Sequence, residues 1–469
     1  MVSTLQWGGR FATAPDSQLL AFGSSLEEDL VLAPFDVECS RAHVAALLAG
    51  GIINESQAAT LLGALQSVHG EITDGRFSES ARAGGFEDVH GAIDARVRAL
   101  AGEAGEWLHA GRSRNDQVAT TLLLYVRDRA RSGARLAHAI ASSLCTRARG
   151  EFEAGTLLAV CTHRQPAQPA MLAFVLVAWA EPFGRATARF LAVGRAAPAT
   201  CPLGSAAAAG SSLPLDRTRA ADALEFAAPS RNALDAIGNR DAALDFAHAF
   251  VRTTIDASRI CEELIAWSAP AYGYVRLGDA ASTGSSLMPQ KRNPDPFELV
   301  RARAAAGVGR YAGALGTLCG LAPSYQRDLQ VTKSQIIAIV EDSLRTLEAF
   351  ARAFGAVTFV REKMAAAALD GYTVATDVAD ALIARGVTAR TAHALVGAAV
   401  ALAESEQRPF AVQDLARLAR DSGIPSLQAP LDAQASVEGK RTRGSTSPGD
   451  VRRQIDSLES ELANLQAQL

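Results

Sequence analysis

One fourteen-residue segment combines hydroxyl, cationic and amide side chains in a way that suits catalysis on a carboxylate. It reads STGSSLMPQKRNPD and occupies residues 282–295. Ser285 supplies a hydroxyl, Lys291 a cation, and Asn293 an amide that both donates and accepts hydrogen bonds. Glycine and serine favour a movable loop, which can close over a ligand, exclude water and bring a serine to the reacting carbon. We therefore predict a catalytic loop at this position.

Four further polar segments carry candidate binding groups, although each segment is ambiguous when taken alone. A lone histidine is more often structural than catalytic, and a run such as GRSRNDQ also fits an ordinary helix start that would attract anions. Their combination in one chain favours a single site. The candidates are Thr162 and His163 in CTHRQPAQP, Arg112, Ser113, Arg114 and Asn115 in GRSRNDQ, Tyr325, Gln330 and Lys333 in YQRDLQVTK, and Asp88 and His90 in EDVHGAIDAR.

Composition excludes several classes of protein. The chain has 469 residues with 48% hydrophobic residues, enough for two or three globular domains. Its formal charge of -4, with acids and bases mixed, offers no basic stripe for nucleic acid. No signal peptide and no membrane-spanning apolar run is recognisable, so a cytoplasmic location is expected. The six cysteines include no Cys-x-x-Cys pair, which predicts buried thiols rather than a zinc site or disulfides.

Long helices are predicted to position these groups. Alanine and leucine dominate two long intervals without proline, at residues 35–165 and 230–269. In residues 334–354 apolar side chains recur at three- and four-residue steps, which is typical of a helix with one buried face. Asn115 or Asp116 is predicted to cap the helix that follows GRSRNDQ.

The order of these features predicts an all-α protein with three zones. The zones are an N-terminal helical domain at 1–111, a central long-helix bundle at 112–360 that carries the loop 282–295, and a C-terminal helical domain at 361–469. Near the end, apolar residues recur at heptad-like spacing, which we interpret as packing against the domain rather than as a coiled coil. These residues are Ile455, Leu458, Leu462 and Leu465.

Taken in order, the segments resemble the argininosuccinate lyase family of the fumarase/aspartase superfamily. The superfamily's mobile-loop pattern, Gly-Ser-Ser-x-Met-Pro-x-Lys-x-Asn-Pro, is complete in residues 284–294. The resemblance extends from residue 7 to about residue 455. Motifs more particular to the family are WGGRF at 7–11, GRSRNDQ at 111–117, THxQxAQP at 162–169, PLGS at 202–205, and DLQ shortly before Lys333.

This resemblance implies both an architecture and a reaction. The family's three mostly helical domains assemble into a homotetramer, in which the central bundles form a twenty-helix core and each active site draws segments from three subunits. The implied reaction is the elimination of argininosuccinate to arginine and fumarate in arginine biosynthesis, with no metal and no organic cofactor. Membranes and nucleic acids are not implied as partners.

The resemblance also implies roles for individual residues. Ser285 would be the general base, while Lys291 and Asn293 would stabilise the aci-carboxylate formed when the proton leaves. His163, with Glu298 as its carboxylate partner, would serve the departing nitrogen. The implied substrate-binding residues are Thr162, Ser113 and Asn115 for the succinyl carboxylates, and Ser25, Tyr325, Gln330 and Lys333 for the rest of the substrate.

The chain departs from the family pattern close to several of these residues. Ala159, Val160 and Cys161 stand where Pro-Gly-Tyr or Pro-Gly-Lys is common, and Arg164 stands where leucine is usual. Residues that are usually acidic near the distal lysine are Val331, Thr332 and Ser334, and a late glycine is Ser445. These changes leave proton abstraction intact but leave the identity of the released amine open.

Three alternatives therefore stand beside the main prediction. One is a related lyase that releases fumarate from another N-substituted aspartate, and another is a non-catalytic, crystallin-like relative. The third, adenylosuccinate lyase, predicts more basic residues for a phosphate and lacks the WGGRF and GRSRNDQ motifs.

Overall fold

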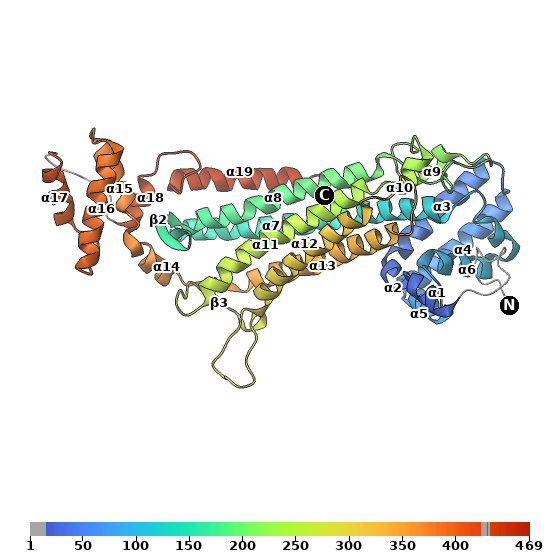
Figure 1. Cartoon of the computed structure of the whole chain (residues 1–469), viewed down its shortest axis with the longest axis horizontal. Coiled ribbons are helices and arrows are strands. Elements are labelled where there is room, and N and C mark those ends of the chain that lie inside the picture. The colour runs from blue at the N-terminus through green and yellow to red at the C-terminus, as the bar shows by residue number, and fades with distance from the viewer. Residues whose placement is uncertain (1–15, 424–428, 430–431) are drawn as a thin grey trace. The chain divides into compact units, whose positions relative to one another are not determined.

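The computed structural model describes residues 16–423, 429 and 432–469, so that WGGRF at residues 7–11 lies outside the described residues. As predicted, the described chain is mostly helical (Figure 1). It forms two compact units. Unit 1 comprises Met1–Ala134, Ala188–Arg252 and Arg303–Arg345, and unit 2 comprises Arg135–Thr187, Thr253–Ala302 and Thr346–Leu469. The division into three domains along the chain stays a prediction.

Five long helices contribute residues to both units. They are α7 (Arg114–Glu153), α8 (Leu172–Ala196), α11 (Asp241–Ser268), α12 (Asp295–Leu318) and α13 (Leu329–Gly355). The helix predicted for residues 334–354 is confirmed within α13. In the described ranges, no helix combines the length and the apolar composition that a bilayer crossing requires.

Unit 1 is built around α3, which packs against α4, α6 and α9. An Asn54 capping box with Gln57 starts α4, because each side chain accepts a hydrogen bond from the other residue's backbone N–H. The further elements of this unit are α1 (Ser17–Gly23), α2 (Leu26–Asp29), η2 (Leu30–Leu32), α3 (Ala33–Ala49), α4 (Glu55–Thr73), α5 (Arg76–Gly84), α6 (Val89–Ala101), η3 (Gly102–Trp107), η4 (Ala197–Ala199), α9 (Arg217–Ala223) and α10 (Ala233–Gly238).

Unit 2 adds two small antiparallel sheets and the C-terminal helices. Strand β1 pairs with β2, and β3 pairs with β4. The bounds of its elements are β1 (Leu157–Thr162), β2 (Gln165–Met171), β3 (Val275–Leu277), η5 (Asp279–Ala281), β4 (Val357–Phe359), α14 (Arg361–Ala367), η6 (Asp370–Tyr372), α15 (Ala375–Ile383), α16 (Ala389–Ser405), α17 (Val412–Asp421), α18 (Ala433–Glu438) and α19 (Pro448–Gln466).

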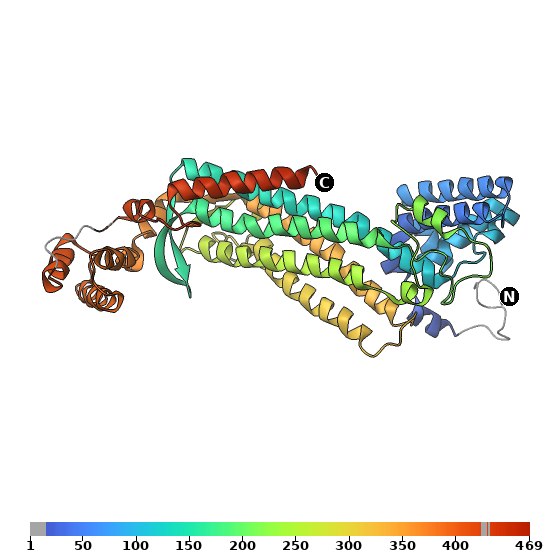
Figure 2. The same ribbon diagram turned by 90° about the horizontal axis from the view of Figure 1, so that it is seen from above.

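The predicted packing of the last helix is confirmed. All four residues of the heptad-like stripe, 455, 458, 462 and 465, are buried. Helix α19 lies along α8 (Figures 1 and 2), and a Cβ at Gly184 of α8 would lie 3.8 Å from the Leu458 side chain. The Arg149 guanidinium of α7 binds Asp456 and Glu459 on the same helix. The stripe is therefore covered within the chain itself.

Two details predicted from the sequence are wrong. Helix α7 begins at Arg114, and the residue before it, Ser113, is the N-cap: its hydroxyl accepts from the Asn115 N–H at 3.2 Å, and the Asp116 carboxylate accepts from the Ser113 N–H at 3.0 Å. These two hydrogen bonds between Ser113 and the first turn of α7 satisfy two backbone N–H groups at the start of the helix, so the cap is Ser113 and not Asn115 or Asp116.

The second detail concerns the cysteines. Four cysteines are buried as predicted, but Cys161 and Cys319 are exposed.

Candidate active site

The predicted catalytic loop is closed at its base by a short antiparallel bridge. The Thr283 N–H donates to the Asn293 carbonyl at 3.2 Å, and the Asn293 N–H donates to the Thr283 carbonyl at 2.8 Å. Between these residues the chain extends away from β3 and from the start of α12 (Figure 1). The Leu287 side chain is 84% exposed. The bridge fixes the two ends of the loop and leaves its tip free to move against a ligand.

Within this loop, Ser285 has an environment that favours an ionised hydroxyl. Its Oγ accepts hydrogen bonds from the Leu287 N–H at 3.3 Å and the Met288 N–H at 3.1 Å. Backbone donors aimed at an oxygen stabilise negative charge on it. Among the described residues, the Lys291 ammonium makes no hydrogen bond and no ion pair, so it is available to a substrate carboxylate.

Asn293 is also tied to the base of the loop. Its side-chain amide donates to the Thr283 hydroxyl and to the Gly284 carbonyl, both at 3.4 Å. These long contacts are weak and exchangeable. The loop therefore carries Ser285, Lys291 and Asn293 together, as the sequence predicted, with two of the three side chains free of strong internal partners.

His163 lies at the tip of the β1–β2 hairpin, next to Thr162 at the end of β1. His163 and Arg164 form its two-residue turn with φ angles of +52° and +62°. Turns of this kind favour asparagine and glycine, because other residues are strained in the left-handed region. Strand β2 tolerates Pro166 and Pro169 because a strand in a two-stranded sheet needs hydrogen bonds on one side only. The strained turn presents an exposed imidazole to solvent.

The sequence missed a carboxylate that links this turn to the helix after the loop. Glu262 of α11 forms ion pairs with Arg164 and with Arg301 of α12. Hydrogen bonding by Arg301 lowers the pKa of Glu262. Glu298 lies exposed in the first turn of α12. Within the described residues it makes no hydrogen bond to His163, and their pairing stays a prediction. No motif in the sequence marks Glu262 as a site residue, and only its ion pairs in the folded structure do so.

A second group of predicted residues meets in unit 1 around Asp29. The Lys333 ammonium lies 2.6 Å from Asp29 Oδ1, and the Ser25 hydroxyl donates to Asp29 Oδ2 at 2.6 Å. The side chains of Lys333 and Asp29 are 4% and 0% exposed. Nearby, the Gln330 side chain donates to the Gly23 carbonyl at 3.1 Å. The spacing of Ser25 and Asp29, one helical turn apart, is the signal that could have identified Asp29 from sequence.

Asp88 and Arg114, two more of the predicted residues of unit 1, form an ion pair at 3.2 Å. Asp88 also caps α6 by accepting from the Gly91 N–H at 2.7 Å. Burial opposes ionisation of this carboxyl, but the neighbouring Arg114 guanidinium lowers its pKa below the ordinary value. Both residues were predicted to bind substrate. Their side chains are 17% and 27% exposed, so a ligand can still reach them.

The prediction for His90 needs correction. Its side chain is fully buried, and its Nδ1 lies 2.8 Å from Asp36 Oδ1. Gln117 donates to the same oxygen at 2.7 Å. An imidazole enclosed in this way has no surface to offer a substrate, so we assign His90 a positioning role. It lies two positions after Asp88 in the sequence, which explains why the sequence suggested a common role.

The remaining predicted residues of unit 1 lie beside this cluster or next to α10 and α11. Arg112 is buried and donates to the Ser40 hydroxyl at 2.9 Å. The Asn115 amide donates to the Ala207 carbonyl at 2.9 Å. Burial raises the pKa of Tyr325, which follows Pro323 in the segment before α13. Arg112 is thus enclosed, whereas Asn115 and Tyr325 keep exposed surface.

The Asp36 cluster makes a prediction about acid stability. Burial tends to raise the pKa of Asp36, but His90, Arg112 and Gln117 outweigh it and hold the pKa at about 2, below the ordinary 3.8. A depressed carboxyl pKa adds stability that is present above the unfolded-state value and is lost as the pH falls toward 2. Asp36→Asn should remove roughly 2 kcal/mol of this acid-sensitive stability.

Urea unfolding of the wild type and Asp36→Asn at several pH values checks this expectation. The difference in unfolding free energy between the two proteins should shrink between pH 5 and the lowest pH at which both fold. A constant difference across this range would show that Asp36 keeps an ordinary pKa.

The structure thus gathers the predicted residues into two groups. Unit 2 holds Thr162 and His163 on the hairpin and the loop residues up to Glu298. Unit 1 holds Ser25, Asp88, Tyr325, Gln330, Lys333 and the residues of GRSRNDQ. The acid, base and substrate-binding roles of both groups stay predictions.

Comparisons with known proteins find similar sequences along nearly the whole chain. A family profile described as Lyase matches residues 9–309, and one described as Argininosuccinate lyase C-terminal matches residues 372–438. The chain is 40% identical to argininosuccinate lyase of Mycolicibacterium paratuberculosis over 468 residues, which covers 99% of this chain and 98% of the relative. It is 41% identical to that of Mycolicibacterium vanbaalenii over 457 residues, with 96% of each chain covered.

Solved structures show the same fold. A variant of EDDS lyase with bound fumarate matches with a TM-score of 0.81 at 25% identity, over 98% of this chain and 92% of that chain. A class II fumarase from Schistosoma mansoni matches with a TM-score of 0.69 at 15% identity, over 85% of this chain and 88% of that one, which shows the fold alone. From its full-length sequence identity, the chain belongs to the argininosuccinate lyase family.

Proposed function

We propose that the chain cleaves argininosuccinate into arginine and fumarate in the cytoplasm, as a step of arginine biosynthesis. The observation that carries this proposal is the Ser285 hydroxyl, which accepts from two backbone N–H groups on a loop that also carries Lys291 and Asn293. Relatives named argininosuccinate lyase at about 40% identity over the full chain support the substrate.

In this mechanism Ser285 removes the proton from the carbon next to a succinyl carboxylate. The electron pair moves into that carboxylate, and Lys291 and Asn293 stabilise the resulting aci-carboxylate. The carbon–nitrogen bond then breaks, the double bond of fumarate forms, and the departing guanidinium nitrogen takes up a proton on the side of His163 and Glu298. Thr162, Ser113 and Asn115 would hold the carboxylates, and Ser25, Tyr325, Gln330 and Lys333 the rest of the substrate.

The proposal includes a homotetramer in which active sites are shared between subunits. Helix α12 supports it, because several large apolar side chains of this helix are exposed. Leu299, Val308 and Leu315 are 57%, 45% and 42% exposed. Small residues between them allow close helix packing, and they include Ala305, Gly309 and Gly313. Light scattering coupled to gel filtration should give four times the chain mass, and a monomer would contradict this part.

Fumarate release, followed by ultraviolet absorbance, tests the proposed reaction. Purified protein should release fumarate rapidly from argininosuccinate and not from adenylosuccinate or aspartate. Chromatography of the same samples should detect arginine in equal amount. A folded tetramer that releases no fumarate from argininosuccinate would contradict the proposal.

A second candidate is a lyase that releases fumarate from another N-substituted aspartate. Cys161 and Arg164 favour it, because both differ from the family pattern and both flank His163. Fumarate release from a panel of N-succinyl amines, together with silence on argininosuccinate, would favour this candidate.

A further inference from the structure

The PLGS motif has no role in the proposed reaction, yet one buried carboxylate joins it to GRSRNDQ. Asp116 lies in the first turn of α7 and is fully buried. Its Oδ2 accepts hydrogen bonds from the Gly204 N–H at 2.9 Å and from the Ala206 N–H at 2.8 Å. Its Oδ1 accepts from the Ser113 N–H at 3.0 Å. One side chain therefore ties the start of α7 to a turn that lies far away in the sequence.

The turn that Asp116 holds, at residues 202–206, has a backbone that needs support. Gly204 and Ala206 have φ angles of +81° and +53°. Glycine adopts such angles freely, but alanine in the left-handed region carries a steric cost and stays there only where its surroundings hold it. Both N–H groups point at the same oxygen of Asp116, as in the backbone concavities that bind anions. The carboxylate thus stabilises an otherwise unfavourable turn.

Arg217, the first residue of α9, also fastens this turn. Its guanidinium donates to the Leu203 carbonyl at 3.1 Å, to the Cys201 carbonyl at 3.2 Å and to the Ser205 hydroxyl at 3.1 Å. A Cβ on Gly204 would lie only 2.7 Å from Arg217 Cγ, so glycine is needed for this close approach. One carboxylate and one guanidinium together fix the turn in unit 1.

The same contacts fix two residues that are proposed to hold the succinyl carboxylates. The Asn115 amide donates to the Ala207 carbonyl at 2.9 Å, directly after the turn. The Ser113 hydroxyl accepts from the Asn115 N–H at 3.2 Å, and the Ser113 N–H donates to Asp116. Asp116 itself is too buried to touch a ligand. Any effect that it has on substrate must therefore pass through Ser113 and Asn115.

Asp116 must be ionised to accept all three hydrogen bonds. A carboxylate only accepts, whereas the oxygen that carries the proton of a neutral carboxyl becomes a donor. Burial raises the pKa of Asp116 to about 6, although its N–H partners and the Arg112 guanidinium favour the charged form. Arg217 also interacts with this charge, and so do the thiols of Cys39 and Cys201, whose pKa values burial raises. The group is thus ionised well above pH 6 and neutral well below it.

We propose that Asp116 is a positioning residue, whose carboxylate holds the turn at residues 202–206 and thereby keeps Ser113 and Asn115 in place for a succinyl carboxylate. The proposal rests on the proposed function for what Ser113 and Asn115 bind. These two residues would hold the substrate to the same extent before and during the reaction, so loss of Asp116 should raise KM and change kcat little.

Asp116→Asn tests the proposal on the full-length protein. Asparagine has nearly the same shape but places a donor where one carboxylate oxygen accepts. KM for argininosuccinate should rise roughly 10-fold to 100-fold, since a displacement of about 1 Å can cost this much. The affinity for fumarate, measured by calorimetry, should fall by a similar factor. The variant should fold, because a pKa that burial raises means that the fold favours the neutral form.

The pH dependence gives a readout that a purely structural role would not move. As the pH falls through about 6, the wild-type carboxyl becomes neutral and resembles the asparagine of the variant. The ratio of the two KM values, variant over wild type, should therefore fall toward one between pH 7.5 and pH 5. Other titrating groups, histidine included, act on both proteins and cancel in this ratio. A ratio that stays constant with pH would overturn the proposal.

Two further variants complete the test. Gly204→Ala leaves Asp116 intact but forces a Cβ against Arg217, so it should raise KM through the turn alone. Asp216→Asn is the matched control: Asp216 is exposed and caps α9 by accepting from the Arg219 N–H at 3.0 Å. It should keep the wild-type KM and the wild-type affinity for fumarate. Unchanged KM values in both Asp116→Asn and Gly204→Ala would overturn the proposal.

The outcomes separate this proposal from the proposed function. Cleavage of argininosuccinate with the same KM in the wild type and Asp116→Asn overturns the positioning role alone. Fumarate binding that weakens in Asp116→Asn, in a protein that cleaves no argininosuccinate, supports the positioning role and rejects the proposed reaction.

Discussion

Replacing Ser285 by alanine is expected to lower kcat for fumarate release by roughly 100- to 10,000-fold, the usual contribution of one positioned base. The fold should survive, because the hydroxyl contacts only the backbone N–H groups of Leu287 and Met288 within an exposed loop. The circular dichroism spectrum, the unfolding midpoint and the mass in solution should equal those of the wild type. The measurement is the initial rate of fumarate absorbance with argininosuccinate.

Ser286→Ala is the matched control for this variant. Ser286 is the next residue of the same loop and is exposed, and among the described residues its hydroxyl makes no hydrogen bond. We expect it to retain most of the wild-type kcat. Near-normal turnover by Ser285→Ala, or a larger loss in Ser286→Ala, would show that the base has been assigned to the wrong serine.

Replacing Lys333 by methionine should lower the free energy of unfolding by about 3–5 kcal/mol, the usual cost of leaving a buried charge without its partner. Methionine fills a similar volume but leaves the Asp29 carboxylate with the Ser25 hydroxyl as its only described side-chain partner. Because Lys333 is also a proposed substrate-binding residue, KM for argininosuccinate should rise in the same variant. Urea unfolding and steady-state kinetics measure the two effects.

The double variant Asp29→Asn with Lys333→Met separates stability from binding. Removing both charges should recover much of the unfolding free energy, since asparagine still accepts the Ser25 hydrogen bond and carries no charge. The rise in KM should remain if Lys333 contacts substrate. Recovery of KM together with stability would instead assign Lys333 a purely structural role.

The sequence by itself determined the helical class, the position of the loop at residues 282–295 and the family. Apolar residues at three- and four-residue steps predicted α13 and the buried face of α19, because that spacing places side chains on one side of a helix. The pattern of residues 284–294 predicted a loop with a hydroxyl, a cation and an amide, since proline and glycine exclude regular structure there. These inferences depend on neighbours along the chain.

The local sequence pattern also gave wrong predictions where two structural explanations fit the same residues. Several residues of GRSRNDQ have side chains that could cap a helix. Ser113 is the cap because α7 begins at Arg114, which leaves the Asn115 N–H without a partner inside the helix. His90 lies two residues from Asp88, yet on a helix such neighbours point in different directions, so one side chain caps α6 while the other is buried against Asp36.

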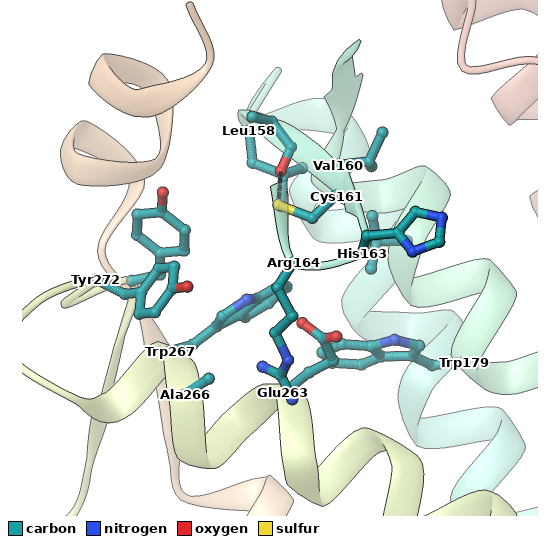
Figure 3. A pocket seen from close by; sticks show the side chains of 13 residues that line it. Leu158, Val160, Cys161, His163, Arg164, Trp179, Glu263, Ala266, Trp267 and Tyr272 are labelled. Carbon is teal, nitrogen blue, oxygen red and sulfur yellow. Dashed lines mark hydrogen bonds between the residues drawn. The ribbon is translucent and has the colours of Figure 1, made fainter. Parts of the chain in front are cut away.

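Only the tertiary structure decided which distant charges meet. Asp29 with Lys333, and Glu262 with Arg164 and Arg301, join residues separated by dozens to hundreds of positions, and no periodicity encodes such distances. An aromatic pocket lined by Trp179, Trp267, Tyr272 and Tyr274 likewise draws its wall from segments that are far apart in the sequence (Figure 3). Burial and charge neutralisation act through space, so the partners of these charged groups became visible only when the helices were packed.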